Sequence, residues 1–222
     1  MAHTLPLSTA EENYLKAIYA LAHPRVSTNA LADRVQTKAS SATDMIQRLS
    51  EKNLVDYEKY RGVALTPEGL FLATSIVRRH RLWEVFLSEK LGFPWGAIHA
   101  LAEELEHIKS QELIDRLDSY LGFPTHDPHG DPIPQADGSI PETRRTLLDR
   151  METGQRFKIV GVIDQSDFLL DFLSENGLLL DSEWILDRII LFDGSCVLLS
   201  PSGLPSVTIS ALAARHIYAQ NI

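Results

Sequence analysis

Residues 40–69, SSATDMIQRLSEKNLVDYEKYRGVALTPEG, decide the fold of the N-terminal part of the chain. Apolar residues recur in its first third at the helical period of about 3.6 residues, which predicts a helix over 39–52. They are Ala42, Met45, Ile46 and Leu49. Residues 54–58 then alternate in polarity, residues 59–62 can form a turn, and the apolar residues 63–65 can return as a second strand. This second pattern predicts a small β-hairpin.

Two further helices precede this block. Ser8 and Glu11 have the spacing of a capping box, and the apolar residues after them repeat with helical period, so we expect a first helix over about 9–22. Ser27 can cap a short second helix that Gln36 and Thr37 interrupt. Helix, helix, tight turn, helix and hairpin follow one another in the order of a winged helix-turn-helix.

The start of the third helix and the hairpin tip carry groups that suit DNA. Small hydroxyl side chains and a lysine donate to phosphates and base edges, and the basic tip YEKYR can track the backbone. Serines at a helix start also serve as plain caps, but the ordered set of elements favours DNA binding. The candidate DNA contacts are Ser27, Thr37, Lys38, Ser40, Ser41, Thr43, Gln47, Lys59, Tyr60 and Arg61.

The charge distribution agrees with this assignment. The chain has 222 residues and a formal net charge of -9, which by itself disfavours a nucleic-acid partner. Residues 25–61, however, contain seven Lys/Arg against five Asp/Glu, a net charge of +2 that leaves -11 elsewhere. The N-terminal part therefore suits an anion, and the remainder suits cations.

Thr66 and Pro67 can open a long helix that reaches about residue 90, and we expect two more helices over 95–108 and 111–121. The apolar positions of this block exceed what a thin helical layer can hide, so we expect it to pack against a second copy of the chain.

Residues 98–107, IHALAEELEH, place four ligand-type side chains on one helix face. They are His99, Glu103, Glu106 and His107. His80 and Glu84 lie one turn apart on the preceding helix, which should run antiparallel, so that His99 can join them. Imidazoles and carboxylates together suit a divalent cation. We therefore expect two adjacent metal sites, one with His99 beside His80 and Glu84 and one with Glu103, Glu106 and His107.

Two other interpretations of these residues stay open. Histidine and glutamate pairs at this spacing are often solvated ion pairs, in which case the chain would be a winged-helix regulator that answers to an organic ligand or a partner protein. A di-metal enzyme is the third interpretation. The sequence has no H-E-x-x-H pattern, no Gly-rich phosphate loop and no G-x-S-x-G elbow, so we do not expect an enzyme.

Residues 123–152 are rich in Pro, Gly, His and Asp, typical of a connector, with one short helix expected over about 143–151. Strand-like runs and one helix over 167–175 follow, which predicts a small β-barrel. There is no run of 18 apolar residues and no signal-peptide pattern, and there is a single cysteine, Cys196, so we expect a cytoplasmic protein without a membrane partner.

Five motifs together resemble the diphtheria-toxin-repressor family of iron- and manganese-dependent regulators. They are AEENYLKAIYAL, residues 40–69, IVRRHRLWEVFL, IHALAEELEH and GDPIP. The resemblance implies an α+β protein with a winged helix-turn-helix (1–73), an all-helical dimerisation and metal-binding domain (74–140) and an SH3-like C-terminal barrel (153–222). It also implies a homodimeric repressor of metal-uptake genes that binds a double-stranded DNA operator when metal is bound.

The family's metal ligands can be carried over residue by residue. The resemblance implies a primary site at Asn13, Glu103, Glu106 and His107, and an ancillary site at His80, Glu84, His99, Asp164 and Asp167. Asn13 departs from the Met or Asp usual there, and Lys16 replaces an acid that some manganese-type members use. Glu103 stands where iron-type members have Cys, so the resemblance favours Mn(II) over Fe(II), with up to two ions per subunit.

Overall fold

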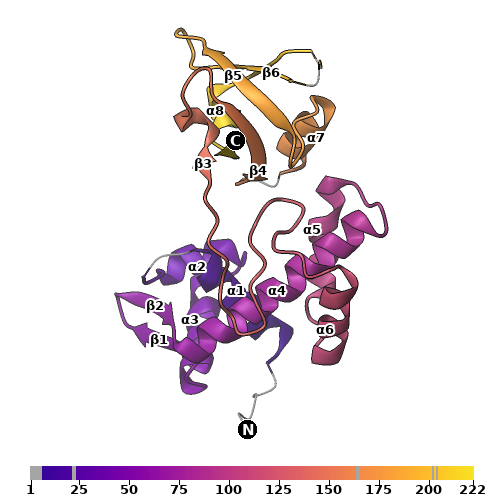
Figure 1. Ribbon diagram of the computed structural model, residues 1–222. Helices are drawn as coiled ribbons and strands as arrows, with labels where there is room; N and C mark the ends of the chain where they lie inside the picture. Colours follow the sequence, from indigo (N-terminus) through magenta and orange to yellow (C-terminus); the bar gives the residue numbers. More distant parts are fainter. Residues whose placement is uncertain (1–6, 22–23, 164–165, 202, 204) are drawn as a thin grey trace.

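The computed structural model describes residues 7–21, 24–163, 166–201, 203 and 205–222. Figure 1 shows a helical part near the N-terminus and a sheet near the C-terminus, joined by a long irregular segment. This segment, residues 121–145, is called the connector below. The described helices include none that is both long and apolar enough to cross a bilayer.

The N-terminal part is a three-helix unit with a hairpin. Its elements are α1 (Thr9–Ala20), α2 (Thr28–Arg34), α3 (Ala39–Glu51), β1 (Val55–Glu58) and β2 (Gly62–Leu65). The expected capping box is present, because Ser8 Oγ accepts from the Glu11 amide while the Glu11 carboxylate accepts from the Ser8 amide. β1 pairs antiparallel with β2. The predicted winged helix-turn-helix is confirmed.

One apolar cluster holds this unit together and extends into the next helix. Leu15, Ile46 and Val63, from α1, α3 and β2, are all 0% exposed. Ala73 and Ile76 of the long helix α4 belong to the same cluster. The winged unit is therefore packed directly on the start of α4. A shift of α1 would affect the packing of the winged unit and of α4 alike.

The helical layer consists of α4 (Pro67–Glu89), a 3-10 turn η1 (Trp95–Ala97), α5 (Ile98–Leu105) and α6 (Gln111–Tyr120). A single helix over 95–108 was expected, and this prediction is wrong at both ends. The chain after Pro94 begins as a 3-10 turn, and the Ile108 amide donates to the Leu105 carbonyl, which tightens the last turn. Glu106 and His107 therefore lie just beyond α5.

The C-terminal part is an antiparallel six-stranded sheet in the order β3-β8-β4-β5-β6-β7. Its elements are β3 (Thr146–Leu147), η2 (Leu148–Arg150), β4 (Arg156–Val162), α7 (Asp167–Glu175), β5 (Glu183–Ile189), β6 (Cys196–Leu199), β7 (Val207–Ile209), α8 (Ala211–Ala214) and β8 (Ile217–Asn221). The short helix expected over 143–151 is wrong, since residues 146–150 form β3 and one 3-10 turn. β3 pairs with β8, a strand that the sequence patterns did not predict.

A buried ion pair fastens the connector to the helical layer. The Arg78 guanidinium donates to Asp118 Oδ2 at 2.6 Å and to the Pro134 carbonyl at 2.7 Å. Both charged side chains are almost fully buried, at 10% and 12% exposure. Because Arg78 lies on α4 and Asp118 on α6, the ion pair joins these two helices, and the hydrogen bond from Arg78 to Pro134 joins them to the connector.

Asp118→Asn removes the charge while keeping the shape of the side chain. It leaves the Arg78 guanidinium buried without its counter-ion, so we expect the free energy of unfolding in urea to fall by about 3 kcal/mol. Asp115→Asn, on the exposed face of the same helix, should change it by less than about 0.5 kcal/mol. Equal effects of the two variants would contradict this account of how the connector is held.

Gly130 marks where the connector meets the sheet. Its φ of +82° favours glycine, and a Cβ there would lie 2.0 Å from the Val160 carbonyl oxygen of β4. Gly122 has a similar φ of +79° but open space around it. Substitution of Gly122 would therefore cause conformational strain alone, whereas substitution of Gly130 would cause both strain and a steric clash.

We expect Gly130→Ala to lower the free energy of unfolding by at least twice as much as Gly122→Ala. The Gly122 variant should cost about 1 kcal/mol for the left-handed conformation, whereas the Gly130 variant must also push β4 away. Urea unfolding of the two variants measures the difference. Similar decreases in the free energy of unfolding would mean that the connector does not approach β4 as closely as it does in the structure.

Candidate metal centre

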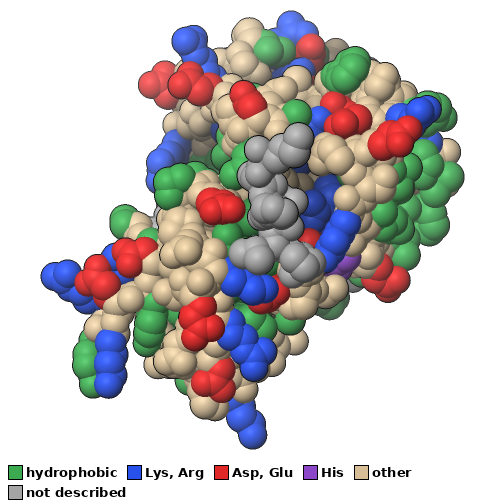
Figure 2. Space-filling model, turned by 90° about the horizontal axis from the view of Figure 1, so that it is seen from below, with side chains coloured by type: hydrophobic (Ala, Val, Ile, Leu, Met, Phe, Trp, Pro, Cys, Tyr) green, Lys and Arg blue, Asp and Glu red, His purple; other side chains and the backbone are tan. Residues whose placement is uncertain are grey.

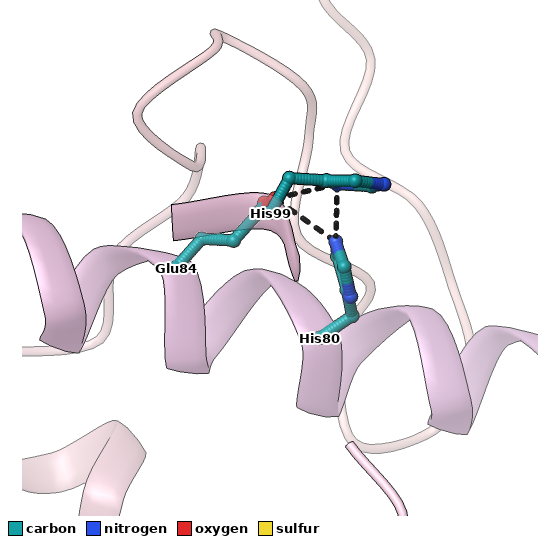
Figure 3. Close-up of side chains that lie close together, drawn as sticks. All are labelled: His80, Glu84 and His99. Atoms are coloured by element: carbon teal, nitrogen blue, oxygen red, sulfur yellow. Dashed lines mark hydrogen bonds and ion pairs between the residues drawn. The ribbon is translucent and has the colours of Figure 1, made fainter. Parts of the chain in front are cut away.

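Three side chains of α4 and α5 converge on one point, and they are called the α4 cluster. They are His80, Glu84 and His99, drawn in Figure 3. His80 Nε2 lies 2.9 Å from Glu84 Oε1 and 3.1 Å from His99 Nδ1, and His99 Nδ1 lies 3.2 Å from the same Glu84 oxygen. The structure therefore brings together the three residues that the sequence grouped.

Glu84 also belongs to a second group, the connector cluster, with Asp127 and His129. These three side chains are all buried, at 1%, 4% and 0% exposure. Asp127 Oδ1 accepts from the His129 and Asp131 amides, which folds the loop so that the His129 ring faces α4. Asp127 and His129 are not among the ligands expected from the sequence, although the two His and two Asp within residues 126–131 are a signal for a metal site.

The surroundings of the His129 ring suit a metal ligand. Both ring nitrogens are buried without a hydrogen-bond partner among the described residues, and Nδ1 lies 3.8 Å from Glu84 Oε1, beyond hydrogen-bond length. Trp95 stacks on the ring at 5.7 Å between centroids, which fixes its plane. Since an unsatisfied buried polar atom is costly, the donor set fits a divalent cation.

The charges around Glu84 favour a cation as well. Burial acts to raise the pKa of Glu84, but the neighbouring imidazoles of His129, His80 and His99 hold it well below its usual value. Burial, and after it the nearby Glu84 carboxylate, raise the pKa of Asp127 to about 7. Glu84 is therefore an anion in a buried position, and an anion of that kind is stabilised by opposite charge.

Glu103, Glu106 and His107, at the end of α5, are called the α5 cluster. Among the described residues the ligand atoms of the other two groups converge within 4.8 Å, whereas those of these three do not. Glu106 is 1% exposed, and its Oε2 lies 2.6 Å from His80 Nδ1 and 2.6 Å from Lys16 Nζ. Burial acts to raise the pKa of Glu106, but His80 and Lys16 lower it below the usual value. His80 therefore connects the α5 cluster to the α4 cluster through its two ring nitrogens.

Helix α1 reaches the α5 cluster through Glu12 and Lys16. Glu12 is buried, and its Oε2 lies 2.6 Å from His107 Nδ1. Asn13, the expected ligand, is exposed instead. Consecutive helical residues point about 100° apart, so a face that turns Glu12 toward His107 turns Asn13 away.

The two expected ligands from the C-terminal part cannot be placed. Asp164 lies outside the described residues. Asp167 begins α7, but its side chain is also outside them.

The expected DNA contacts lie mainly on an open surface of the winged unit. Nine of the ten are exposed. The tenth, Thr43, is half-buried, and its hydroxyl donates to the Ala39 carbonyl. Ser27 also caps α2 by accepting from the Ala30 amide. Tyr60 at the wing tip is 94% exposed. Figure 2 shows Lys and Arg side chains among Asp and Glu side chains on the face seen from below.

Two family descriptions match consecutive parts of the chain. Residues 6–63 match the iron-dependent repressor N-terminal DNA-binding domain, and residues 66–135 match the iron-dependent repressor metal-binding and dimerisation domain. All members of the three clusters therefore fall in the second match, and α1 falls in the first.

Individual proteins agree with these matches. The iron-dependent repressor IdeR of Mycobacterium leprae is 33% identical over 125 residues, 55% of this chain and 54% of that protein. The chain thus spans about half the length of such mycobacterial relatives. The regulator MntR of Listeria innocua is 34% identical over 60% of this chain and 95% of its own length.

A solved structure described as a manganese-dependent transcriptional repressor in complex with manganese covers more of the chain. It is 36% identical, with a TM-score of 0.87 over 96% of this chain and 100% of that one. The chain therefore belongs to the iron-dependent repressor family of metal-dependent, DNA-binding transcriptional regulators.

Proposed function

We propose that this chain is a homodimeric transcriptional repressor that binds its DNA operator when Mn(II), with Fe(II) as the alternative ion, fills its metal centre. Its target genes would serve metal-ion uptake. The observation that carries the proposal is the position of Glu84, a buried carboxylate between two groups of ligand side chains. The similarity to a repressor solved with manganese supports the same ion.

The residues present can hold up to two ions. Glu84 would hold one ion together with either His80 and His99 or Asp127 and His129. In each of these groups, one ligand atom of every residue lies within 4.8 Å of those of the others. Glu103, Glu106 and His107 would hold the other. Asn13, which is exposed and turned away from the α5 cluster in the structure, remains a proposed additional ligand from the family resemblance, as do Asp164 and Asp167.

The ligand chemistry favours manganese. The described clusters offer carboxylate oxygens and imidazole nitrogens, and the single cysteine is buried in the C-terminal sheet. A shell without thiolate suits a harder ion such as Mn(II). When bound, the ion supplies positive charge that links ligands from separate elements.

Metal binding would act on DNA affinity through α1. Glu12 and Lys16 belong to the first helix of the winged unit, yet they contact His107 and Glu106 of the helical layer. If Glu106 and His107 held an ion, their contacts with Lys16 and Glu12 would change, and this change would bias the position of the winged unit. A ligand that prefers one arrangement shifts the population toward it.

We propose the domain division at 1–73, 74–140 and 153–222, and an SH3-like arrangement for the third domain. Its short antiparallel strands with two irregularities in register support this. Exposed apolar side chains near α5 and α6 support a dimer contact of the second domain. They are Leu91, Phe93, Leu113, Tyr120 and Phe123.

Glu84→Gln tests the metal centre, because the amide keeps the shape but lacks the charge. We expect Mn(II) affinity, measured by calorimetric titration, to fall by at least about tenfold at one site. Glu89→Gln, an exposed change one turn further along α4, is the matched control. The native chain giving no Mn(II) or Fe(II) heat would favour a regulator that answers to an organic ligand.

The fluorescence of Trp95 gives an independent measurement of Mn(II) binding. Its stacking on His129 should make its fluorescence fall when paramagnetic Mn(II) fills the connector cluster. Trp95→Phe gives the background from the other two tryptophans. A Mn(II) response that survives Trp95→Phe unchanged would place the ion away from His129.

Lys38→Ala tests the DNA interface at the exposed start of α3. With DNA selected from a random pool in the presence of Mn(II), we expect weaker binding and a salt dependence (log K against log[salt]) shallower by about 0.9. Arg116→Ala on α6 is the matched charge control. Chelation of the metal should abolish selection, whereas binding that ignores the chelator would contradict metal-dependent repression.

A further inference from the structure

Lys16 places a cation inside the metal centre. Its Nζ lies 2.6 Å from Glu106 Oε2, 3.3 Å from His80 Nδ1 and 3.7 Å from Glu103 Oε1. The lysine side chain is 19% exposed, so this ammonium group is largely removed from water. Its three neighbours are all proposed metal ligands.

The other cations near the centre are arranged differently. Arg79 donates to the Glu106 backbone carbonyl and to Glu12, not to the Glu106 carboxylate. Lys109 contacts the Leu7 carbonyl and lies 3.9 Å from Glu12. Among the Lys and Arg residues that the structure describes, the ion pairs of the Glu103 and Glu106 carboxylates are with Lys16.

We propose that Lys16 is a tethered cation that competes with the metal ion for Glu106, and so sets the metal concentration at which the protein responds. This inference rests on the proposed function and deepens it. In the metal-free chain the ammonium group is a counter-ion of Glu106, a buried carboxylate whose same oxygen also contacts the His80 imidazole. An ion held by Glu106 would compete with the lysine for this carboxylate and would displace the ammonium group.

The displacement also gives α1 a specific role. Lys16 lies on α1, while Glu106 follows α5, so the ion pair ties the winged unit to the helical layer in the metal-free chain. Metal binding exchanges this contact for contacts of the ion. The lysine is therefore an affinity-determining residue whose release accompanies the change at the winged unit.

Lys16→Met removes the competing charge and keeps most of the length. We expect Mn(II) affinity at the Glu106 site to rise by about tenfold, measured by calorimetry against a chelator of known affinity. Lys16→Arg should stay within about threefold of the native chain because it retains the charge. Lys109→Met, which removes a nearby charge that does not touch Glu106, should change affinity by less than about twofold.

A metal-free measurement supplies the second readout. In the presence of a chelator, Lys16→Met should melt at a lower temperature than the native chain, because Glu106 has lost its counter-ion. Mn(II) should then raise its melting temperature by more than it raises that of the native chain. If Lys16→Met fails to fold, Lys16→Gln, which can still donate to Glu106, takes its place with the same expectations.

The outcomes separate the inference from the function on which it rests. A native chain that binds no Mn(II) or Fe(II) overturns the proposed function, and the competition with it. A native chain that binds Mn(II), with a folded Lys16→Met variant of equal or weaker affinity, overturns the competition alone. Equal gains from Lys16→Met and Lys109→Met would also overturn it, because they would show a general charge effect.

Discussion

The structure depends on one buried carboxylate, Glu84. Its side chain is 1% exposed, and a charge in such a position is tolerated when opposite charge and hydrogen bonds surround it. The imidazoles of His80 and His99 come from two helices, and His129 comes from the connector. The arrangement of α4, α5 and the connector is therefore also the arrangement of the ligands.

The polar contacts of α1 extend this constraint to the winged unit. Glu12 is 4% exposed and lies against His107, so the first helix has a buried polar interaction with the helical layer, not an apolar one alone. Apolar contacts tolerate small shifts, whereas hydrogen-bonded ion pairs depend on distance and direction. A change at His107 or Glu106 therefore has a geometric consequence at α1, which is the requirement for coupling a metal centre to a DNA-binding unit.

Local patterns predicted the fold where local interactions decide it. The capping box at Ser8, the period of α3 and the hairpin after it are set by residues close in sequence. The pairing of His80 and Glu84 on one helix face follows from the same period. By contrast, His129 reaches Glu84 across 45 residues of chain, and the exposure of Asn13 depends on how α1 is rotated against the layer. Neither is visible in spacing. The strands β3 and β8 also depend on long-range pairing, because β3 pairs with β8 and β8 pairs in addition with β4.

The connector makes the C-terminal sheet part of the metal centre's support. The Val162 amide of β4 donates to the His129 carbonyl at 2.9 Å, and Gly130 lies too close to β4 for any side chain. Arg145 donates to the Gly130 carbonyl and lies 3.8 Å from the centre of the Tyr218 ring of β8. Backbone contacts on both sides of His129 thus fix the loop before an ion binds. Ordering a loop costs conformational entropy, which reduces binding affinity. Because the sheet already holds His129 in place, less of the free energy of ion binding is spent on ordering the loop.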